Sequence, residues 1–309
     1  MVQFTVSVFM LTYNQECFIA QAINGVLMQK SNFAYQLVIG EDCSTDDTYK
    51  ICENFALAYP SKIKLLPKLD LNIGLIANYM RTIKECDGKF IAICDGDDYW
   101  TDVLKLQKQV DFLELNPDYA IVGSNLKKLY ANGEMIASIN RGRQETYEFD
   151  DLIFANLLPS VTAVFKNITI EEPLPSWILN FPYGDWPTYL WTIRNGGKIH
   201  LLGDITAVYR MDIGVSSKMR IKNSNIIKAN LLILDFIFSD LNFAHKKDII
   251  KISIERLNGN LMTSYNRERK YISSIKLLFQ NLSQSHNKRK IIKIYFYSLK
   301  KSIKSILLR

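Results

Sequence analysis

The first 115 residues alternate short apolar runs with longer segments of helical period, and this alternation limits the possible folds more than any other feature. It predicts strands over residues 4–11, 36–40, 63–66 and 89–94, and helices over residues 18–28, 45–59, 75–86 and 103–115. Strands and helices that alternate at this spacing form parallel βαβ units, whose helices cover both faces of the sheet. We therefore predict an α/β fold with a Rossmann-like, mostly parallel sheet.

The pattern is less regular after residue 120, where we predict a hairpin at 131–134 and a strand over 161–165. Charge then changes sign. Residues 220–309 hold 19 Lys and Arg against 5 Asp and Glu, whereas residues 1–219 hold 19 against 26. We place a domain boundary there: residues 1–219 are predicted to form the α/β domain, and residues 220–309 a basic, mainly helical extension.

The five cysteines are an odd set without C-x-x-C spacing or a nearby His, so they indicate neither a disulfide framework nor a zinc site. A reducing cytoplasm fits this usage. The first residues show no cationic signal region, and the most apolar later stretch, 231–238, is short and contains Asp235. We expect a cytoplasmic protein without a membrane-spanning helix.

Three acids, Asp95, Asp97 and Asp98, follow the apolar run that ends at Cys94. Like charges at this spacing oppose one another's ionisation unless a cation lies between them. Carboxylates without His or Cys suit Mg²⁺ or Mn²⁺, which commonly bridge to phosphates. The alternative is a solvated acidic turn that caps the following helix.

Three polar loops should meet at one edge of the sheet, because ligands of open α/β sheets bind at the carboxyl ends of the strands. These loops are residues 12–16, 41–47 and 95–98. No G-x-x-x-x-G-K-[ST] is present, and no G-x-G-x-x-G follows the first strand. A phosphate bound at this edge would therefore not be held by a glycine loop.

Five segments, taken together, closely resemble the family 2 glycosyltransferases of the GT-A fold. They are VSVFMLTYN (6–14), EDCSTDDT (41–48), NIG (72–74), GKFIA (88–92) and DGDDYW (95–100), in the family's order and spacing. The resemblance covers residues 4–125 strongly and is reduced to scattered motifs up to residue 217. It departs from the family at Cys43, where Gly is usual, and at Glu41, where Asp is common.

The resemblance implies a nucleotide-sugar donor lying across the three loops, with UDP expected as the family's commonest carrier. Carried over by position, the nucleotide-binding residues are Thr12, Tyr13, Asn14, Glu16, Asp42, Asn72 and Asp97, with Asp42 bound to the base and Asp97 facing the ribose or metal. Asp98 would coordinate Mn²⁺ or Mg²⁺ bridging the diphosphate. Asp212 stands where relatives often have the His of Tyr-Arg-x-His, so it could also ligate the metal or simply end a strand.

Asp185 is the candidate catalytic base, because the family places an acid before a helix at a similar position. It would remove the acceptor proton while the hydroxyl oxygen attacks the anomeric carbon, so that a single displacement inverts the configuration. The alternative is structural, since Asp185 precedes Pro187 as a residue that caps a helix would.

Structural alternatives exist for other candidates too. Ser44 or Thr45 is expected to cap the helix predicted over 45–59, and Asn14 and Glu16 could simply close a strand-helix turn. Four tryptophans follow the acidic motif and could stack on sugar rings, although Trp191 fits core packing better; they are Trp100, Trp177, Trp186 and Trp191.

The predicted function is inverting transfer of a sugar to a glycan or lipid-linked acceptor in surface polysaccharide synthesis. The alternatives are a non-catalytic binding module of the same fold and a sugar-phosphate nucleotidyltransferase. Residues 288–309 carry eight basic residues and no acid, interleaved with apolar ones, which is the pattern of a helix bound to an anionic inner membrane face. A helix packed on the domain is the alternative, and the acidic body argues against a nucleic-acid partner.

Overall fold

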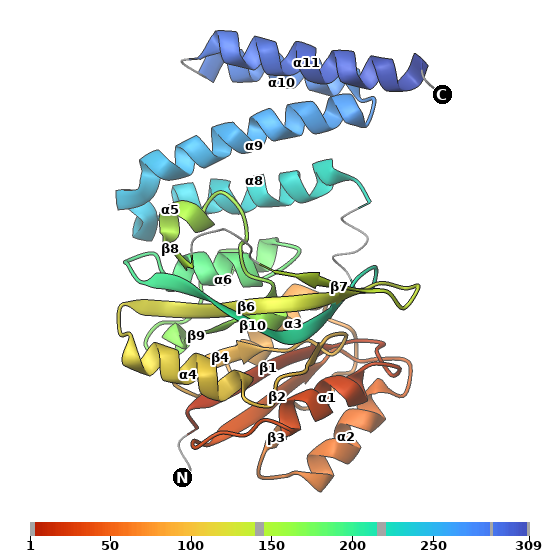
Figure 1. Ribbon diagram of the computed structural model, residues 1–309, viewed down its shortest axis with the longest axis vertical. Helices are drawn as coiled ribbons and strands as arrows, with labels where there is room; N and C mark the ends of the chain where they lie inside the picture. The colour runs from red at the N-terminus through yellow and green to blue at the C-terminus, as the bar shows by residue number, and fades with distance from the viewer. Residues whose placement is uncertain (1–3, 140–144, 215–220, 285–286, 308–309) are drawn as a thin grey trace. The chain divides into compact units, whose positions relative to one another are not determined.

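The protein contains an α/β unit built on one mixed sheet and a helical unit (Figure 1). The computed structural model describes residues 4–139, 145–214, 221–284 and 287–307. The chain divides into two compact units, Met1–Gly214 and Val215–Arg309. The boundary predicted after residue 219 lies outside the described residues.

The predicted alternation of strands and helices is confirmed, and each of the eight elements lies within three residues of its expected bounds. In chain order these are β1 (Val6–Thr12), α1 (Ile19–Leu27), β2 (Tyr35–Glu41), α2 (Thr48–Ala58), β3 (Ile63–Leu65), α3 (Leu75–Ile83), β4 (Phe90–Ile93) and α4 (Lys105–Leu115). One element was not predicted: β5 (Tyr99–Trp100) follows the acidic motif directly.

The rest of the first unit is less regular, as expected. It contains β6 (Tyr119–Leu129), β7 (Met135–Ser138), β8 (Thr146–Tyr147), α5 (Phe149–Leu152), β9 (Val164–Lys166), α6 (Asp185–Thr192) and β10 (Lys198–Arg210), with short 3-10 turns between them. The predicted hairpin is confirmed, since β6 and β7 pair antiparallel and Tyr130 N donates to Glu134 O at 2.9 Å. The strand predicted from residue 161 starts later, because Ser160–Thr162 form a 3-10 turn.

The strand order is β3-β2-β1-β4-β9-β6-β10-β5. The first four strands are parallel, whereas β9 runs antiparallel between β4 and β6. Thr12 pairs with Glu41, and Phe9 pairs with Ile93. The carboxyl ends of β1, β2 and β4 therefore lie at the same edge of the sheet.

Strand β1 is buried on both faces, as expected for a central parallel strand. Val8 and Met10 pack into one core cluster with Ile23 of α1. On the other face the Phe9 ring meets the Tyr79 ring of α3 edge-on, with centroids 4.8 Å apart. These two layers hold the strand ends in place.

The second unit is helical, with α8 (Asn223–Ser239), α9 (Lys247–Arg267), α10 (Tyr271–Gln284) and α11 (Lys288–Leu307). Within it, α9 lies between α8 and the α10–α11 pair (Figure 1). Met262, Leu278 and Tyr295 form a small core that joins α9, α10 and α11. Across the described ranges, no helix is both long and apolar enough to cross a bilayer.

Candidate active site

The loops after β1 and β2 are joined by hydrogen bonds. Asn14 N donates to Ser44 Oγ at 2.9 Å, and Asn14 Oδ1 accepts from Thr45 N at 2.8 Å. Glu16 Oε2 accepts from Asp47 N at 2.9 Å. Asn14 and Glu16 therefore bridge two loops, which is more than closing a local turn, and their contact with a nucleotide stays a prediction.

The prediction that Ser44 or Thr45 caps α2 is wrong. The helix begins at Thr48, whose N donates to Asp46 Oδ1 at 3.0 Å. Ser44 and Thr45 instead bond to Asn14, as described above, so they are held by the neighbouring loop.

Cys43 has φ 60°, in the left-handed region that favours Gly, which is the residue expected at this position from the family resemblance. Its N and that of Ser44 both donate to the Glu41 carboxylate, at 3.1 and 2.6 Å. These bonds hold the strained turn after β2 in place.

Asp42 is buried, and its carboxylate fastens the turn before α3. Oδ1 accepts from Ile73 N at 2.8 Å, and Oδ2 accepts from Gly74 N and Asn72 Nδ2, both at 3.0 Å. Burial raises the pKa of Asp42, and the two backbone donors oppose that rise. Asp42 and Asn72, both predicted to bind the nucleotide, therefore lie together and shape one wall of this edge.

Thr12 and Tyr13 lie at the end of β1 and just beyond it, with contrasting exposure. Tyr13 is 43% exposed, so its ring is accessible to a ligand. Thr12 is buried, and its Oγ1 has no hydrogen-bond partner among the described residues. A Cβ added to Gly96 would lie 2.8 Å from Thr12 Oγ1, so the acidic loop touches the end of β1.

The acidic loop is partly or fully buried rather than solvated, which argues against a simple surface turn. Burial, with smaller contributions from the charges of Asp97 and Asp185, raises the pKa of Asp95 to about 8. Burial also raises the pKa values of Asp97 and Asp98. Asp95 Oδ1 has no hydrogen-bond partner in the described part of the chain.

Two residues near this loop were missed by the sequence reasoning. Arg210, the last residue of β10, donates from its backbone N to Asp98 Oδ1 at 2.8 Å and from Nη1 to Asp97 O at 2.5 Å. A Cβ added to Gly214 would lie 2.7 Å from Asp97 Oδ2. The only sequence signal was the Tyr-Arg-x-His-like segment at 209–212, from which we considered Asp212 alone.

Asp97 and Asp98 supply the hard oxygen donors that Mg²⁺ and Mn²⁺ prefer, and such ions often take one or two carboxylates and complete their shell with phosphates and water. The residues present therefore fit such an ion. Asp212 is exposed with φ 64°. No group of three His, Cys, Asp or Glu side chains in the described ranges is placed to hold a metal, so Asp97, Asp98 and Asp212 do not gather into a three-carboxylate site.

Asp185 is the first residue of α6, and Gly184 occupies the N-cap position. Asp185 therefore does not hold the N-cap position itself, but as an acid in the first turn it still favours the N-terminus of the helix. Its Oδ2 accepts from Asn156 Nδ2 at 2.8 Å. The charge of Asp185 contributes to the raised pKa of Asp95; its role as base stays a prediction.

Three of the four tryptophans are buried and cannot present a ring face to a sugar. Trp100 and Trp186 donate from Nε1 to the backbone carbonyls of Val161 and Leu152, both at 2.9 Å. Trp191 is also buried, as expected. Trp177 is half-buried against Trp191 and Phe181.

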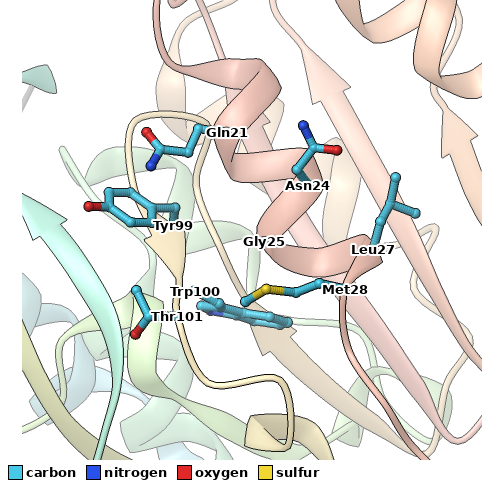
Figure 2. A pocket seen from close by; sticks show the side chains of 8 residues that line it. All are labelled: Gln21, Asn24, Gly25, Leu27, Met28, Tyr99, Trp100 and Thr101. Atoms are coloured by element: carbon cyan, nitrogen blue, oxygen red, sulfur yellow. The ribbon is translucent and has the colours of Figure 1, made fainter.

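A pocket of about 580 Å³ lies between α1 and β5 (Figure 2). Its lining residues are Gln21, Asn24, Gly25, Leu27, Met28, Tyr99, Trp100 and Thr101. None of the residues predicted to bind the nucleotide or the metal lines it. It lies behind the acidic loop, which continues directly into Tyr99.

Relatives support the expected family. The chain is 30% identical over 207 residues to the uncharacterized protein Rv1520 of Mycobacterium tuberculosis, covering 66% of this chain and 58% of that protein. It is 33% identical over 166 residues to the dTDP-rhamnosyl transferase RfbG of Shigella flexneri, covering 53% and 55%. The chain thus spans little more than half the length of these relatives.

Solved structures confirm the GT-A fold. The S. aureus TarS fragment 1-349 in complex with UDP-GlcNAc has a TM-score of 0.62 at 18% identity and covers 97% of this chain and 92% of its own. The Pyrobaculum calidifontis mannosyltransferase PcManGT, in complex with GDP-Man and Mn²⁺, has a TM-score of 0.57 at 13% identity and covers 98% and 87%.

Residues 7–167, more than half of the 309 residues, match Glycosyl transferase family 2. This range contains β1, β2 and β4 and the three loops at their ends. The chain therefore belongs to glycosyl transferase family 2.

Proposed function

We propose that the protein moves a sugar from a nucleotide-sugar donor, with UDP as the favoured carrier, to a hydroxyl of a glycan or lipid-linked acceptor in surface polysaccharide synthesis. One observation carries this proposal. The parallel strands β1, β2 and β4 end at one edge, where Asp42 and the acidic loop come together in a member of this family. That edge is where open α/β sheets bind ligands.

We propose a different task for the two parts of this edge, the loops after β1 and β2 and the acidic loop after β4. Tyr13 and Asn14, with Asp42 and Asn72 behind them, border the nucleoside. Asp97 and Asp98 would hold Mn²⁺ or Mg²⁺, which when bound supplies positive charge to the departing diphosphate. The Mn²⁺ in the PcManGT structure supports this choice of ion by analogy.

Asp185 is proposed to orient the acceptor hydroxyl and take its proton onto a carboxylate oxygen. The acceptor oxygen then bonds to the anomeric carbon as the bond from that carbon to the diphosphate oxygen breaks. The electron pair of the broken bond leaves with the nucleoside diphosphate. Because attack and departure occur on opposite faces in one step, the configuration inverts.

The donor class can be tested by thermal unfolding with UDP-, dTDP- and GDP-sugars, each with and without Mn²⁺. A ligand that binds only the folded chain stabilises it by about 2.7 kcal/mol at 100 times its Kd. We expect the largest rise in Tm with a UDP-sugar and Mn²⁺. The name of RfbG includes dTDP, the TarS structure contains UDP-GlcNAc and the PcManGT structure contains GDP-Man, so all three carriers belong in the panel.

If no nucleotide sugar raises Tm, the proposal fails. A binding module without activity would show the Tm rise, and yet the mixture would release no nucleoside diphosphate in the presence of acceptor glycans. Donor turnover therefore separates the two functions.

We further propose that α10 and α11 bind the cytoplasmic face of an anionic membrane. Neither helix contains an acid, and both leave large apolar side chains exposed; the basic residues lie mainly on α11, since α10 has Lys276 alone. The exposed apolar residues include Ile272, Ile275 and Phe279 on α10, and Ile292, Phe296 and Ile303 on α11. A basic helix with exposed apolar residues fits an anionic lipid surface, at about 1 kcal/mol per basic residue near it.

Flotation with phosphatidylglycerol vesicles tests this surface. Replacing Lys300, Lys301 and Lys304 by Gln should reduce flotation, whereas the same change at the exposed Lys50, Lys62 and Lys84 of the first unit should not. Equal flotation of both triple variants, or no flotation of the wild type, would refute membrane binding through these helices.

A further inference from the structure

The Arg210 side chain is enclosed at the end of β10, behind the acidic loop. It is only 7% exposed, and its guanidinium carbon lies 4.7 Å from the centre of the Phe18 ring and 4.8 Å from that of Tyr99. Arginine suits this position because its planar group stacks on aromatic faces and still directs its N–H donors sideways.

The donors of Arg210 reach three different places. The backbone N binds Asp98 Oδ1, Nη1 binds Asp97 O, and Nη2 binds Gln21 Oε1 of α1. Arg210 therefore fixes one carboxylate of the candidate metal pair through its main chain, holds the backbone of the other through its side chain, and ties both to α1.

The surroundings of Arg210 are themselves firmly packed. Figure 2 shows Gln21 beside the Tyr99 ring at one end of the pocket, on α1 and β5 respectively. Gly25 of α1 packs so closely on β5 that a Cβ there would lie 2.9 Å from Trp100 N. Arg210 thus bonds to a helix that packs closely on β5, and the acidic loop bonds to Arg210.

We propose that Arg210 is a positioning residue that sets the geometry of Asp97 and Asp98 before the cation and donor bind. The inference rests on the proposed function for the identity of those ligands. A guanidinium also places one positive charge beside two buried carboxylates and so limits their mutual repulsion. Lysine would keep the positive charge, but it lacks the planar group that stacks on two rings and directs donors to both Asp97 O and Gln21.

Arg194 provides a matched control. It also stacks on an aromatic ring, with its guanidinium carbon 4.0 Å from the centre of the Trp191 ring, and it pairs with Glu172. Its contacts with Trp191 and Glu172 lie outside the acidic loop. Arg194→Lys should therefore reproduce the general cost of replacing an enclosed arginine without disturbing Asp97 or Asp98.

Two measurements on the full chain test the proposal. Asp98 N donates to Asp95 O at 3.0 Å, so amide hydrogen exchange at Asp98, measured without added metal, reports the order of the loop. In calorimetric titrations of UDP at rising Mn²⁺, the Mn²⁺ concentration that gives half of the maximal gain in UDP affinity, the midpoint, reports the metal requirement. Arg210→Lys should accelerate the exchange and raise the midpoint about 10- to 100-fold, the usual effect of losing a residue that orients a metal ligand.

At saturating Mn²⁺ the UDP affinity of Arg210→Lys should return close to that of the wild type, which a general loss of folding would not allow. Wild-type behaviour of Arg210→Lys, or an equal midpoint shift in Arg194→Lys, would overturn the proposal. If Arg210→Lys does not fold, Gln21→Leu replaces it as the test, because it removes one hydrogen-bond partner of Arg210. Gln21→Leu should change the exchange rate and the Mn²⁺ midpoint in the same directions, by smaller amounts. If it changes neither, the proposal is also overturned. If the wild type binds none of UDP, dTDP and GDP, the proposed function fails, and the exchange measurement still tests Arg210.

Discussion

The two halves of the candidate donor edge differ in how their buried carboxylates are satisfied. In the nucleoside half, the Asp42 carboxylate accepts three hydrogen bonds from the turn at 72–74. In the acidic half, Asp98 accepts from Arg210 N, and Asp95 Oδ1 has no partner among the described residues. Burial raises the pKa of Asp95 to about 8 in the same region.

The difference shows which half the chain builds alone. Buried carboxylates are stable when hydrogen bonds or positive charge balance them. Asp42 has its donors within the protein, so the nucleoside half is formed in advance. In the acidic half, burial opposes the ionisation of the carboxyls and Arg210 offsets this only in part, so a bound cation would stabilise their charged form.

The largest expected effect is a loss of transfer rate in Asp185→Asn that leaves both halves of the donor edge intact. Asp185→Asn keeps the side-chain size and an acceptor for Asn156, but it cannot take a proton. Transfer should fall about 10²- to 10⁴-fold while UDP affinity and Tm stay near wild-type values, because neither half is changed. Rates, calorimetry and melting curves on the same preparation check this. Near wild-type turnover would remove Asp185 from the mechanism.

Asp42→Ala should break the nucleoside half. It leaves the backbone donors of Ile73 and Gly74 without their acceptor, at a cost of about 3 kcal/mol in the free energy of unfolding. Urea denaturation should show the same loss with and without Mn²⁺, because no cation completes this half. Asp42→Asn retains one acceptor oxygen, so its free energy of unfolding should lie between those of the wild type and Asp42→Ala. A loss that Mn²⁺ restores would contradict the comparison.

Lys105 tests whether burial alone shifts a pKa next to the acidic half. Its ammonium donates to Gln109 Oε1 at 2.6 Å and lies 4.4 Å from the centre of the Trp100 ring. Burial lowers the pKa of Lys105 to about 7. Above pH 7 the folded chain has lost this proton, whereas the unfolded chain keeps it until about pH 10.4.

The unfolded state therefore binds more protons in this window, and the contribution of Lys105 to stability rises with pH by up to about 1.4 kcal/mol per unit. Lys105→Met should lack this rise. Urea unfolding of both proteins from pH 7 to pH 9.5 measures it, and parallel curves would show that burial does not depress this pKa.

The smallest expected effects are those of Ala at Gly214 and Gly133, which distinguish the cost of backbone strain from the cost of contact with the acidic half. Gly214 and Gly133 have φ 77° and 83°, where Ala costs about 1 kcal/mol. A Cβ at Gly133 meets nothing within 4 Å, whereas one at Gly214 would press on Asp97. Both Ala variants should lose similar stability, but only Gly214→Ala should weaken Mn²⁺-dependent UDP binding. Equal binding by both variants would remove Gly214 from the site.

The sheet could be predicted because β1, β2 and β4 are buried and bounded by polar loops, so the local pattern contains their period. Strand β5 escaped prediction because two residues are too few to show a period. The capping of α2 was misjudged because Ser44 and Thr45 are held by Asn14, thirty residues away. Local sequence cannot show which of two acceptable bonds a side chain makes.

The candidate acids could be named because they cluster within four residues after a strand. Arg210 could not, because it reaches Asp98 across 112 positions of sequence and looks like an ordinary strand end. Burial of Trp100 and Trp186 was equally hidden, since an aromatic residue suits a core and a sugar site alike. Long-range packing decides both cases.

The central claim is that the acidic half requires a cation and the nucleoside half does not. Calorimetry of UDP binding to wild type and Asp98→Asn, each with Mn²⁺ and with EDTA, tests it most directly. We predict that EDTA weakens wild-type binding about 10-fold or more, to the affinity that Asp98→Asn shows in both conditions. Wild-type affinity that is unchanged by EDTA and by Asp98→Asn would contradict the account.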